Sequence, residues 1–384
     1  MRLLLLATLA TTALARKTTR EERHAIAALP TVSGNPLVSL EHINLSSGDT
    51  WSERVDAFYF DVLRCARDPR SPAVLARTNS ARAKQNRPGV ANQSWANIGF
   101  QQFHLLYGDG LDEEMQQPPQ QRLRGEIVLA WPRHQMKGLY ARLAEWGAAF
   151  TGIGTFEGPF GNRFRLVAAD DVLAPLPDAT ADDVPPGGDS EGLGILAVRF
   201  DAPRGTSGAI CEFYSSVFNA VVDATGGRCV VSVGDAQTLE FVEADEVAAY
   251  DGHHIALYVD GAAFVRGYGA LKDRGLVFEN RRFLQFTCRA ASSLRLWPLP
   301  RVDGAGRHTA SPRPNTLPRR RRRGSPSHGF ARRYGTLADA LKHDEFRVKD
   351  IAGNDNQIVY ELEHEVRTLR HPGFVARRHV RQEL

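Results

Sequence analysis

The sequence has no long uninterrupted apolar run and holds little cysteine. Its 384 residues include four Cys, and they are 42% hydrophobic and 24% charged, with 34 Gly and 21 Pro. A helix needs about 18 or more apolar residues to span a bilayer, so we expect no membrane span. Collagen-like, wholly disordered and disulfide-scaffold proteins have other compositions. The sequence therefore predicts a folded chain of about two domains.

Three common catalytic signatures are also absent. The chain has no G-x-S-x-G elbow, no G-x-x-x-x-G-K-[ST] phosphate loop and no H-E-x-x-H helix. No local pattern therefore favours a nucleophilic Ser or Cys.

The net charge of +4 is concentrated in one segment. Residues 289–330 hold ten Arg and one Asp, a local charge of +9, which leaves −5 for the rest of the chain. The folded part is thus mildly acidic, and we expect no nucleic acid as its partner. The segment also holds six Pro and the run Arg319–Arg323, which predicts a disordered insertion. A translated intron or a nuclear-localisation patch would look the same.

The first residues have the parts of a secretory signal peptide. Arg2 precedes an apolar stretch from Leu3 to Leu14, and small residues around Ala15 precede a basic run. This pattern predicts residues 1–15 as a signal peptide, cleaved after Ala15, and entry into the secretory pathway. The alternative is an amphipathic first helix, although the segment offers no charged face.

The four cysteines are widely spaced and form no metal-binding pattern. Cys211 and Cys229 could pair in an oxidising compartment, but nothing in the sequence fixes their distance. Cys65 and Cys288 have no near partner in the sequence. Single buried thiols are the expectation for all four.

The two halves of the chain repeat one order of elements. Residues 171–192 carry four Pro, five Asp and three Gly, which predicts a linker between residues 37–170 and 193–370. Each half shows a strand and a helix with a Phe-Tyr pair, and later a second strand and a helix ending at glycine. The strands are expected at residues 40–45, 126–131, 195–200 and 254–259, and the helices at 55–63, 139–146, 210–218 and 264–274. An internal repeat of this kind strongly restricts the architecture.

Short motifs within the repeat carry a family resemblance. They are Leu40-Glu41-His42-Ile43-Asn44-Leu45 leading to Phe58-Tyr59, Gly161-Asn162-Arg163-Phe164-Arg165-Leu166, and Gly252-His253-His254-Ile255-Ala256-Leu257-Tyr258-Val259-Asp260. They resemble the vicinal oxygen chelate superfamily of glyoxalases, extradiol dioxygenases and bleomycin-resistance proteins, in a tandem-domain subgroup. The resemblance covers roughly residues 37–367. It implies an α+β fold of four βαβββ modules, paired into two open curved-sheet domains with ligand on the concave faces. The first domain would span residues 37–170, and the second residues 193–370 with the insertion inside it.

Alternation in the first half places four polar side chains opposite an apolar strand face. Because successive side chains of a strand point to opposite sides, His42, His104, Glu126 and Arg165 would share the cleft. The superfamily's ligands lie on these four strands. The resemblance therefore implies a site of His42, His104 and Glu126 for iron, manganese or zinc.

Arg165 opposes that interpretation. A guanidinium cannot ligate a metal and would rather pair with Glu126. The alternative is a metal-free cleft that binds an anionic ligand through Arg165 and the imidazoles.

In the second half, Glu240, His254 and Glu361 face the cleft by the same alternation, while Val198 stands at the first-strand position. The resemblance makes these three residues part of a glyoxalase-like site for manganese, magnesium or nickel. Glu240 and Glu361 would then move protons, and this second cleft is the better metal candidate. The charged run that follows Leu362 is expected to be partly solvated, and a slip of one residue would change the set at the cleft.

The first functional hypothesis is a divalent-metal-dependent lyase, isomerase or dioxygenase that acts on a small oxygenated substrate. The second is a metal-free small-molecule binding or sequestration protein of the same fold. A third interpretation is an interaction protein that uses the arginine-rich insertion. The chain would be a monomer or a homodimer.

Overall fold

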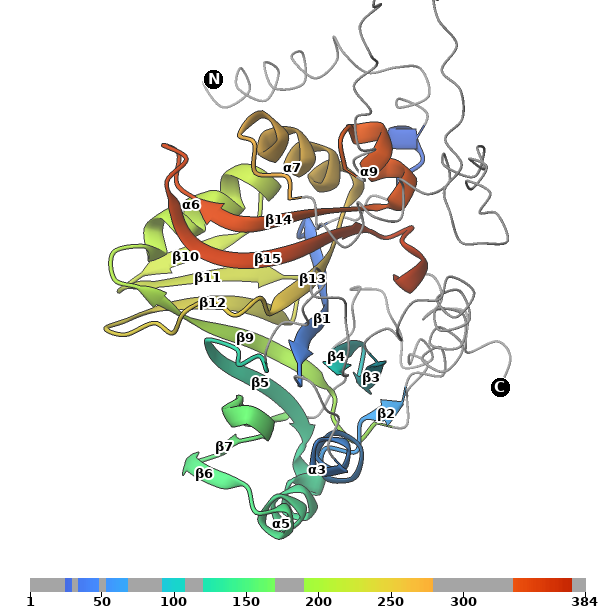
Figure 1. Ribbon diagram of the computed structural model, residues 1–384, viewed down its shortest axis with the longest axis vertical. Coiled ribbons are helices and arrows are strands. Elements are labelled where there is room, and N and C mark those ends of the chain that lie inside the picture. The colour runs from blue at the N-terminus through green and yellow to red at the C-terminus, as the bar shows by residue number, and fades with distance from the viewer. Residues whose placement is uncertain are drawn as a thin grey trace, which may run out of the picture.

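The computed structural model describes residues 25–29, 34–47, 53–67, 92–107, 120–169, 190–278 and 334–374 (Figure 1). The expected signal peptide, the insertion at residues 289–330 and nearly all of the expected linker lie outside the described residues. Within the described ranges, no helix is both long and apolar enough to cross a membrane.

The first half of the chain forms two modules of strand, helix and further strands. The first module comprises β1 (Leu37–Ser46), α3 (Glu53–Ala57) with the π-helical turn η1 (Phe58–Val62), β2 (Ala66–Arg67), β3 (Asn92–Ile98) and β4 (Gln101–Tyr107). The second comprises β5 (Gly125–Pro132), η3 (Arg133–Gln135), α5 (Met136–Trp146), β6 (Ala149–Gly152), β7 (Thr155–Glu157), η4 (Pro159–Gly161) and β8 (Arg163–Ala169).

The second half repeats the plan. The third module comprises β9 (Gly194–Pro203), α6 (Ser207–Phe218), β10 (Val222–Thr225), β11 (Arg228–Val233) and β12 (Gln237–Ala244). The fourth comprises β13 (His254–Val259), α7 (Gly261–Asp273), α9 (Leu337–His343), β14 (Glu345–Ala352) and β15 (Ile358–Thr368). In the described part of this module, a single bridge between Val277 and Val348 takes the place of the strand that follows the helix elsewhere.

The modules combine into two curved sheets. The seven-stranded sheet, here called sheet A, has the order β14-β15-β13-β1-β4-β3-β2, and the eight-stranded sheet B has the order β10-β11-β12-β9-β5-β8-β7-β6. The predicted α+β class with four modules in two curved sheets is confirmed. Each sheet joins one module from each half, because β1 pairs antiparallel with β13 and β5 pairs antiparallel with β9.

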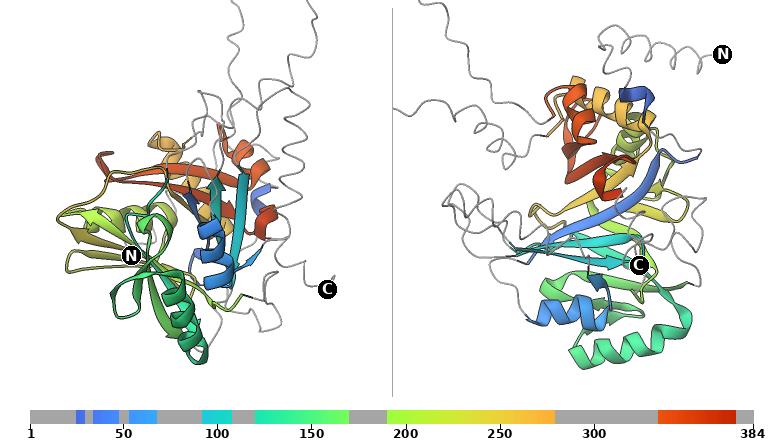
Figure 2. Two further views of the ribbon diagram at one scale, coloured as in Figure 1. Left: turned by 60° about the horizontal axis from the view of Figure 1, so that its bottom comes forward. Right: turned by 90° about the vertical axis from the view of Figure 1, so that its right-hand side faces the viewer.

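The helices, in contrast, pack against helices of the same half of the chain. The helix α5 contacts η1 in the first half, and α6 contacts α7 in the second, so these two groups lie at opposite ends of the molecule (Figures 1 and 2). In the first half Phe103 of β4 packs near Phe164 of β8, with ring centroids 6.1 Å apart. In the second half Phe200 of β9 packs near Tyr360 of β15, with centroids 6.2 Å apart. Within each half, side chains from the two sheets therefore pack against each other. Each sheet, in contrast, contains strands from both halves.

Local sequence explains where these elements begin and end. Asp260 caps α7 by accepting a hydrogen bond from the backbone of Ala263, and Thr336 and Asp339 form a capping box at α9. At the start of β5, Gly125 has a φ of 149°, and a Cβ there would lie 1.8 Å from the carbonyl oxygen of Arg199. Only glycine allows β5 to approach β9 this closely.

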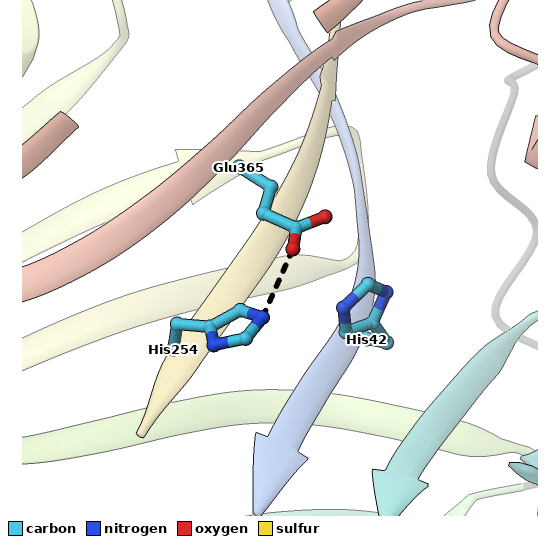
Figure 3. Close-up of side chains that lie close together, drawn as sticks. All are labelled: His42, His254 and Glu365. Atoms are coloured by element: carbon cyan, nitrogen blue, oxygen red, sulfur yellow. Dashed lines mark ion pairs between the residues drawn. The ribbon is translucent and has the colours of Figure 1, made fainter. Parts of the chain in front are cut away.

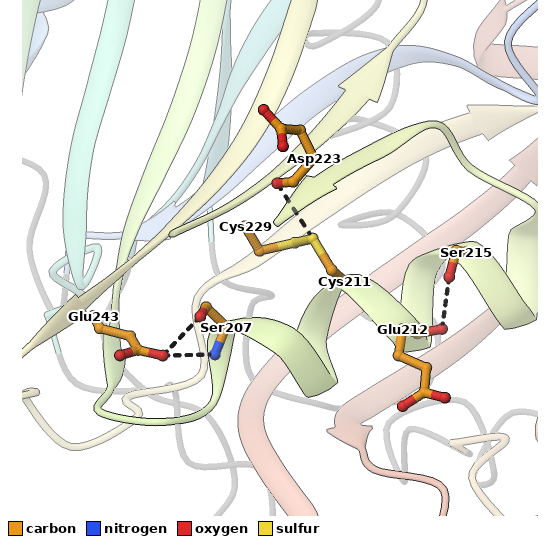
Figure 4. Close-up of a disulfide and its surroundings, with 7 residues drawn as sticks. All are labelled: Ser207, Cys211, Glu212, Ser215, Asp223, Cys229 and Glu243. Atoms are coloured by element: carbon orange, nitrogen blue, oxygen red, sulfur yellow. Dashed lines mark hydrogen bonds between the residues drawn. A yellow bond between two sulfur atoms is a disulfide. The ribbon is translucent and has the colours of Figure 1, made fainter. Parts of the chain in front are cut away.

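A disulfide joins α6 to β11. Cys211 and Cys229 are bonded, with their Cα atoms 5.5 Å apart (Figure 4). The expectation of single thiols was wrong for this pair, because the helix packs directly on its own sheet and sequence spacing does not reveal that contact. Cys65 is a free, buried thiol as expected.

Beside the disulfide, the start of α6 is held by a carboxylate. Glu243 accepts hydrogen bonds from the backbone and the hydroxyl of Ser207 (Figure 4). Together with the backbone N–H of Gly205, these donors lower the pKa of Glu243 to about 2.

The disulfide predicts a clear loss of stability on removal. Because it closes a sequence separation of 18 residues, the double variant Cys211→Ala and Cys229→Ala should lose about 3 kcal/mol of unfolding free energy. Urea denaturation measures this loss. Reducing agent should destabilise the unmodified chain and leave the double variant unchanged; an equal response of both proteins would contradict the assignment.

Candidate metal centre

Four polar side chains lie together on the four central strands of sheet A. His104 comes from β4, His42 from β1, His254 from β13 and Glu365 from β15. Donor atoms of His42, His254 and Glu365 all lie within 4.8 Å of one another, and all three residues are buried (Figure 3). Because β1 and β4 belong to module one and β13 and β15 to module four, neither module could form this group alone.

A bulge in β1 turns His42 towards the group. Leu40 pairs with Leu257 and His42 pairs with Ala256, so β1 has one more residue than β13 at this point. Leu40 and Ile43 are both in the hydrophobic core, which strict alternation does not allow. The extra residue resolves the conflict and leaves His42 on the face opposite the core.

The imidazoles of this group have unused nitrogens. Both ring nitrogens of His42 and Nε2 of His254 are buried and make no well-aligned hydrogen bond among the described residues, and Nδ1 of His42 lies 3.6 Å from Glu41. Nε2 of His254 lies 3.0 Å from a carboxylate oxygen of Glu365 (Figure 3). Buried polar atoms without partners are costly, and nitrogens that converge on a carboxylate are the arrangement that metal ligation requires.

Burial keeps His42 and His104 neutral. Desolvation lowers the pKa of His42 despite the nearby carboxylate of Glu41. The pKa of His104 is lowered well below its usual value by burial and by the neighbouring His42 and His254. Neutral imidazoles offer lone pairs, so they can act as ligands at neutral pH.

His104 lies beside the three-residue group. Its ring stacks on Trp95 with centroids 3.7 Å apart, and it meets the ring of His42 edge to face at 5.5 Å. Trp95 itself lies 5.4 Å from His42. These two flat rings form one wall next to the candidate ligands.

A buried network of charges holds Glu365. Arg347 and Arg367 pair with its two oxygens. Their attraction outweighs the desolvation that would raise the pKa of Glu365, and it holds that pKa well below the usual value. The carboxylate therefore stays ionised.

The network as a whole lacks positive charge. The two arginines contact four buried carboxylates, those of Glu41, Glu345, Glu363 and Glu365. Two guanidiniums and four carboxylates give these six side chains a formal charge of −2. A divalent cation between His42, His254 and Glu365 would balance it, so the donors, their geometry and their charge all fit a metal ion.

The structure groups the predicted site residues differently from the sequence interpretation. His42, His104 and His254 lie together on sheet A, whereas Glu126, Arg165 and Glu240 lie on sheet B. The two expected clefts, one in each half, are therefore not formed; the pairing of strands mixes the halves. Alternation finds the face of each residue but not the strand that pairs beside it.

Two further positions differ. Glu361 is on β15, but its side chain is 45% exposed and pairs with Lys349 at 3.1 Å. Glu365, four residues further along the strand, takes the expected place beside His254. In β9 the residue on the polar face is Arg199, while Val198 is in the core.

Several residues of the site were missed by sequence reasoning. Glu361, Glu363 and Glu365 alternate along one strand. This pattern predicts the correct face of the strand, but not which position along it lies at the site. No local pattern in the sequence marks Arg347, Arg367 or Trp95, because their roles depend on which side chains the strand pairing brings together.

At the end of sheet A, His371 gives a pH dependence. Burial, with a further contribution from Arg367, lowers its pKa to about 4, while its Nδ1 accepts a hydrogen bond from Gly373. The unfolded value is near 6.5, so the stability from this neutral histidine is complete above pH 6.5 and is lost as the pH falls towards 4. His371→Asn keeps an acceptor but cannot titrate. Its unfolding free energy should fall less steeply over this window, by up to about 1.4 kcal/mol per pH unit. Denaturation at several pH values measures both slopes, and parallel slopes would contradict this role.

Comparison with known proteins adds solved structures only. No family model and no curated protein matches the chain. A protein from Bacillus subtilis subsp. subtilis str. 168 with a provisional dioxygenase assignment is 12% identical, with a TM-score of 0.39 over 67% of this chain and 76% of that chain. A glyoxalase I mutant from Zea mays is 10% identical, with a TM-score of 0.44 over 94% of this chain and 99% of that chain.

A smaller protein is similar to about one third of the chain. It is the fosfomycin resistance protein FosX from Listeria monocytogenes, complexed with Mn(II), at 16% identity and a TM-score of 0.24 over 34% of this chain and 92% of that chain. The module order and the two curved sheets are the ones that the sequence resemblance implies. The observed fold is therefore the one that the sequence resemblance predicts, with all four modules in one chain.

Proposed function

We propose that the protein is a divalent-metal-dependent enzyme whose metal is held by His42, His254 and Glu365. The observation that carries this proposal is the convergence of two buried imidazoles, those of His42 and His254, and the ionised carboxylate of Glu365 within 4.8 Å. Two histidines and one carboxylate leave coordination positions open for substrate, and this donor set suits iron, manganese or zinc. The expected reaction class is a lyase, isomerase or dioxygenase acting on a small oxygenated molecule.

The chain's own residues have distinct tasks in this proposal. Arg347 and Arg367 orient Glu365 and keep it ionised. The stacked rings of Trp95 and His104 form a flat wall that positions the substrate. When bound, the metal supplies a Lewis acid that stabilises negative charge developing on a substrate oxygen.

The candidate site is complete within one chain. All its residues come from modules one and four of the same molecule. A monomer would therefore suffice for the proposed activity, and a homodimer would not need to share ligands. The small-molecule substrate is the partner that this arrangement implies.

Metal content tests the proposal directly. The purified protein, loaded in turn with Mn²⁺, Fe²⁺, Zn²⁺ and Ni²⁺, should retain one equivalent of metal. His254→Ala and Glu365→Gln should each weaken binding at least about 100-fold, because ligands matter more than the outer partners whose loss costs 10- to 100-fold. Elemental analysis after dialysis measures the stoichiometry.

Glu126→Gln is the matched control, since Glu126 is also a buried carboxylate but lies on the other sheet. It should retain full metal content. If no variant and no wild-type sample holds metal, the alternative hypothesis of a metal-free binding or sequestration protein replaces this one.

We also propose that the chain enters the secretory pathway. The apolar stretch before Ala15 supports this, and so does the Cys211–Cys229 disulfide, since such bonds persist mainly in oxidising compartments. The mature protein should begin at Arg16. N-terminal sequencing of the protein from its native source tests the cleavage, and an intact Met1 would contradict it.

A further inference from the structure

Sheet B carries a different ionic arrangement on the face opposite its core. Arg199 lies between two carboxylates: its Nη1 is 3.2 Å from Glu126, and its Nε is 3.0 Å from Glu240. In strand register, Glu126 pairs with Arg199 and Arg199 pairs with Glu240. The three side chains are therefore direct neighbours on the adjacent strands β5, β9 and β12.

This place corresponds to the candidate metal centre of sheet A. In both sheets, the first strands of two modules pair antiparallel at the centre, and the last strand of each module flanks them in parallel. The centre of sheet A carries His42, His254 and Glu365 on β1, β13 and β15. The centre of sheet B carries Glu126, Arg199 and Glu240 on the matching strands.

We propose that Arg199 is the resident cation of sheet B: its guanidinium bridges modules two and three and excludes a metal ion from Glu126 and Glu240. The side chains of these two glutamates are only 9% and 11% exposed, so they would repel each other without a cation between them. A guanidinium is permanently charged, and its planar fork reaches two carboxylates at once.

Charge balance distinguishes the two sheets. Glu126 also pairs with Arg165 at 2.8 Å, and Glu240 also pairs with Arg228 at 2.9 Å. Three guanidiniums thus face two carboxylates, for a formal charge of +1, whereas the network of sheet A stands at −2. A divalent cation is favoured in sheet A and repelled in sheet B. The chain should therefore carry one metal centre rather than two, and this inference does not depend on which metal sheet A binds.

Thermal unfolding of variants tests the bridging role. Arg199→Met should lower the Tm by roughly 3 to 6 °C because it removes the ion pairs with both glutamates. The loss is moderate because these ion pairs are partly exposed and screened by solvent. Arg163→Met is the matched control: Arg163 lies on the same face but pairs with the single carboxylate of Asp201 at 2.8 Å. It should lower the Tm by clearly less.

Second variants separate charge from packing. Adding Glu240→Gln to Arg199→Met should restore part of the lost Tm, because it removes the repulsion between the carboxylates. Arg199→Lys should fall between wild type and Arg199→Met, because an ammonium keeps the charge but lacks the fork. If Glu240→Gln lowers the Tm of Arg199→Met further, or if Arg199→Met melts like the Arg163 control, the proposal is wrong.

The metal-excluding role is tested in a His254→Ala background, where sheet A lacks a ligand. There, Mn²⁺ should leave the Tm unchanged while Arg199 is present and should raise it by a few degrees when Arg199→Met is added. Glu240→Gln should abolish that gain. Mn²⁺ stabilisation with Arg199 intact, or none after its removal, would overturn the proposal. The background keeps this result separate from the proposed function of sheet A.

Discussion

The antiparallel pairing of first strands between modules is the contact on which the rest of the structure depends. Within each module the first and last strands lie side by side. The other edge of the first strand is therefore free to pair with a strand of another module. β1 finds β13 and β5 finds β9, and each pairing brings polar faces from both halves of the chain together. The helices meanwhile pack within each half, so sheets and helices link different pairs of modules. Neither half can separate from the other without breaking both sheets.

Two equivalent places follow from this pairing, and only side-chain charge makes them different. The network around Glu365 is buried and short of positive charge, and it leaves imidazole nitrogens without partners. The network around Arg199 supplies its own cations and leaves its guanidiniums partly exposed. On geometry alone, the polar face at the centre of each sheet would be expected to hold a metal ion. The balance of carboxylates and guanidiniums separates them, because a cation binds where the fixed charge is negative.

The sequence predicts the modules and the polar face of each strand, but it does not predict which modules pair to form each sheet. Period-two alternation correctly assigned His42, His254 and Glu240 to faces opposite the core, since that pattern depends only on neighbouring residues. Which strands lie side by side depends on contacts between positions more than 200 residues apart, such as His42 with Ala256. The bulge at Glu41 depends on the same long-range pairing, whereas the position of Glu365 along β15 and the Cys211–Cys229 bond depend on tertiary contacts over shorter separations. Local patterns carry no information about them.

The buried network of sheet A also connects binding to folding. Taking four carboxylates and two arginines out of water costs free energy that their mutual attraction has to offset, and the excess negative charge adds to that cost. A ligand that binds only the folded state stabilises it in proportion to its affinity and concentration. A divalent ion held by His42, His254 and Glu365 would thus offset the strain of a site built for it. The same residues that leave the metal-free protein less stable than an apolar sheet would make the metal-loaded form the stable one. Sheet B, neutralised by Arg199 and its neighbours, has no such requirement, and it can support the fold while sheet A carries the chemistry.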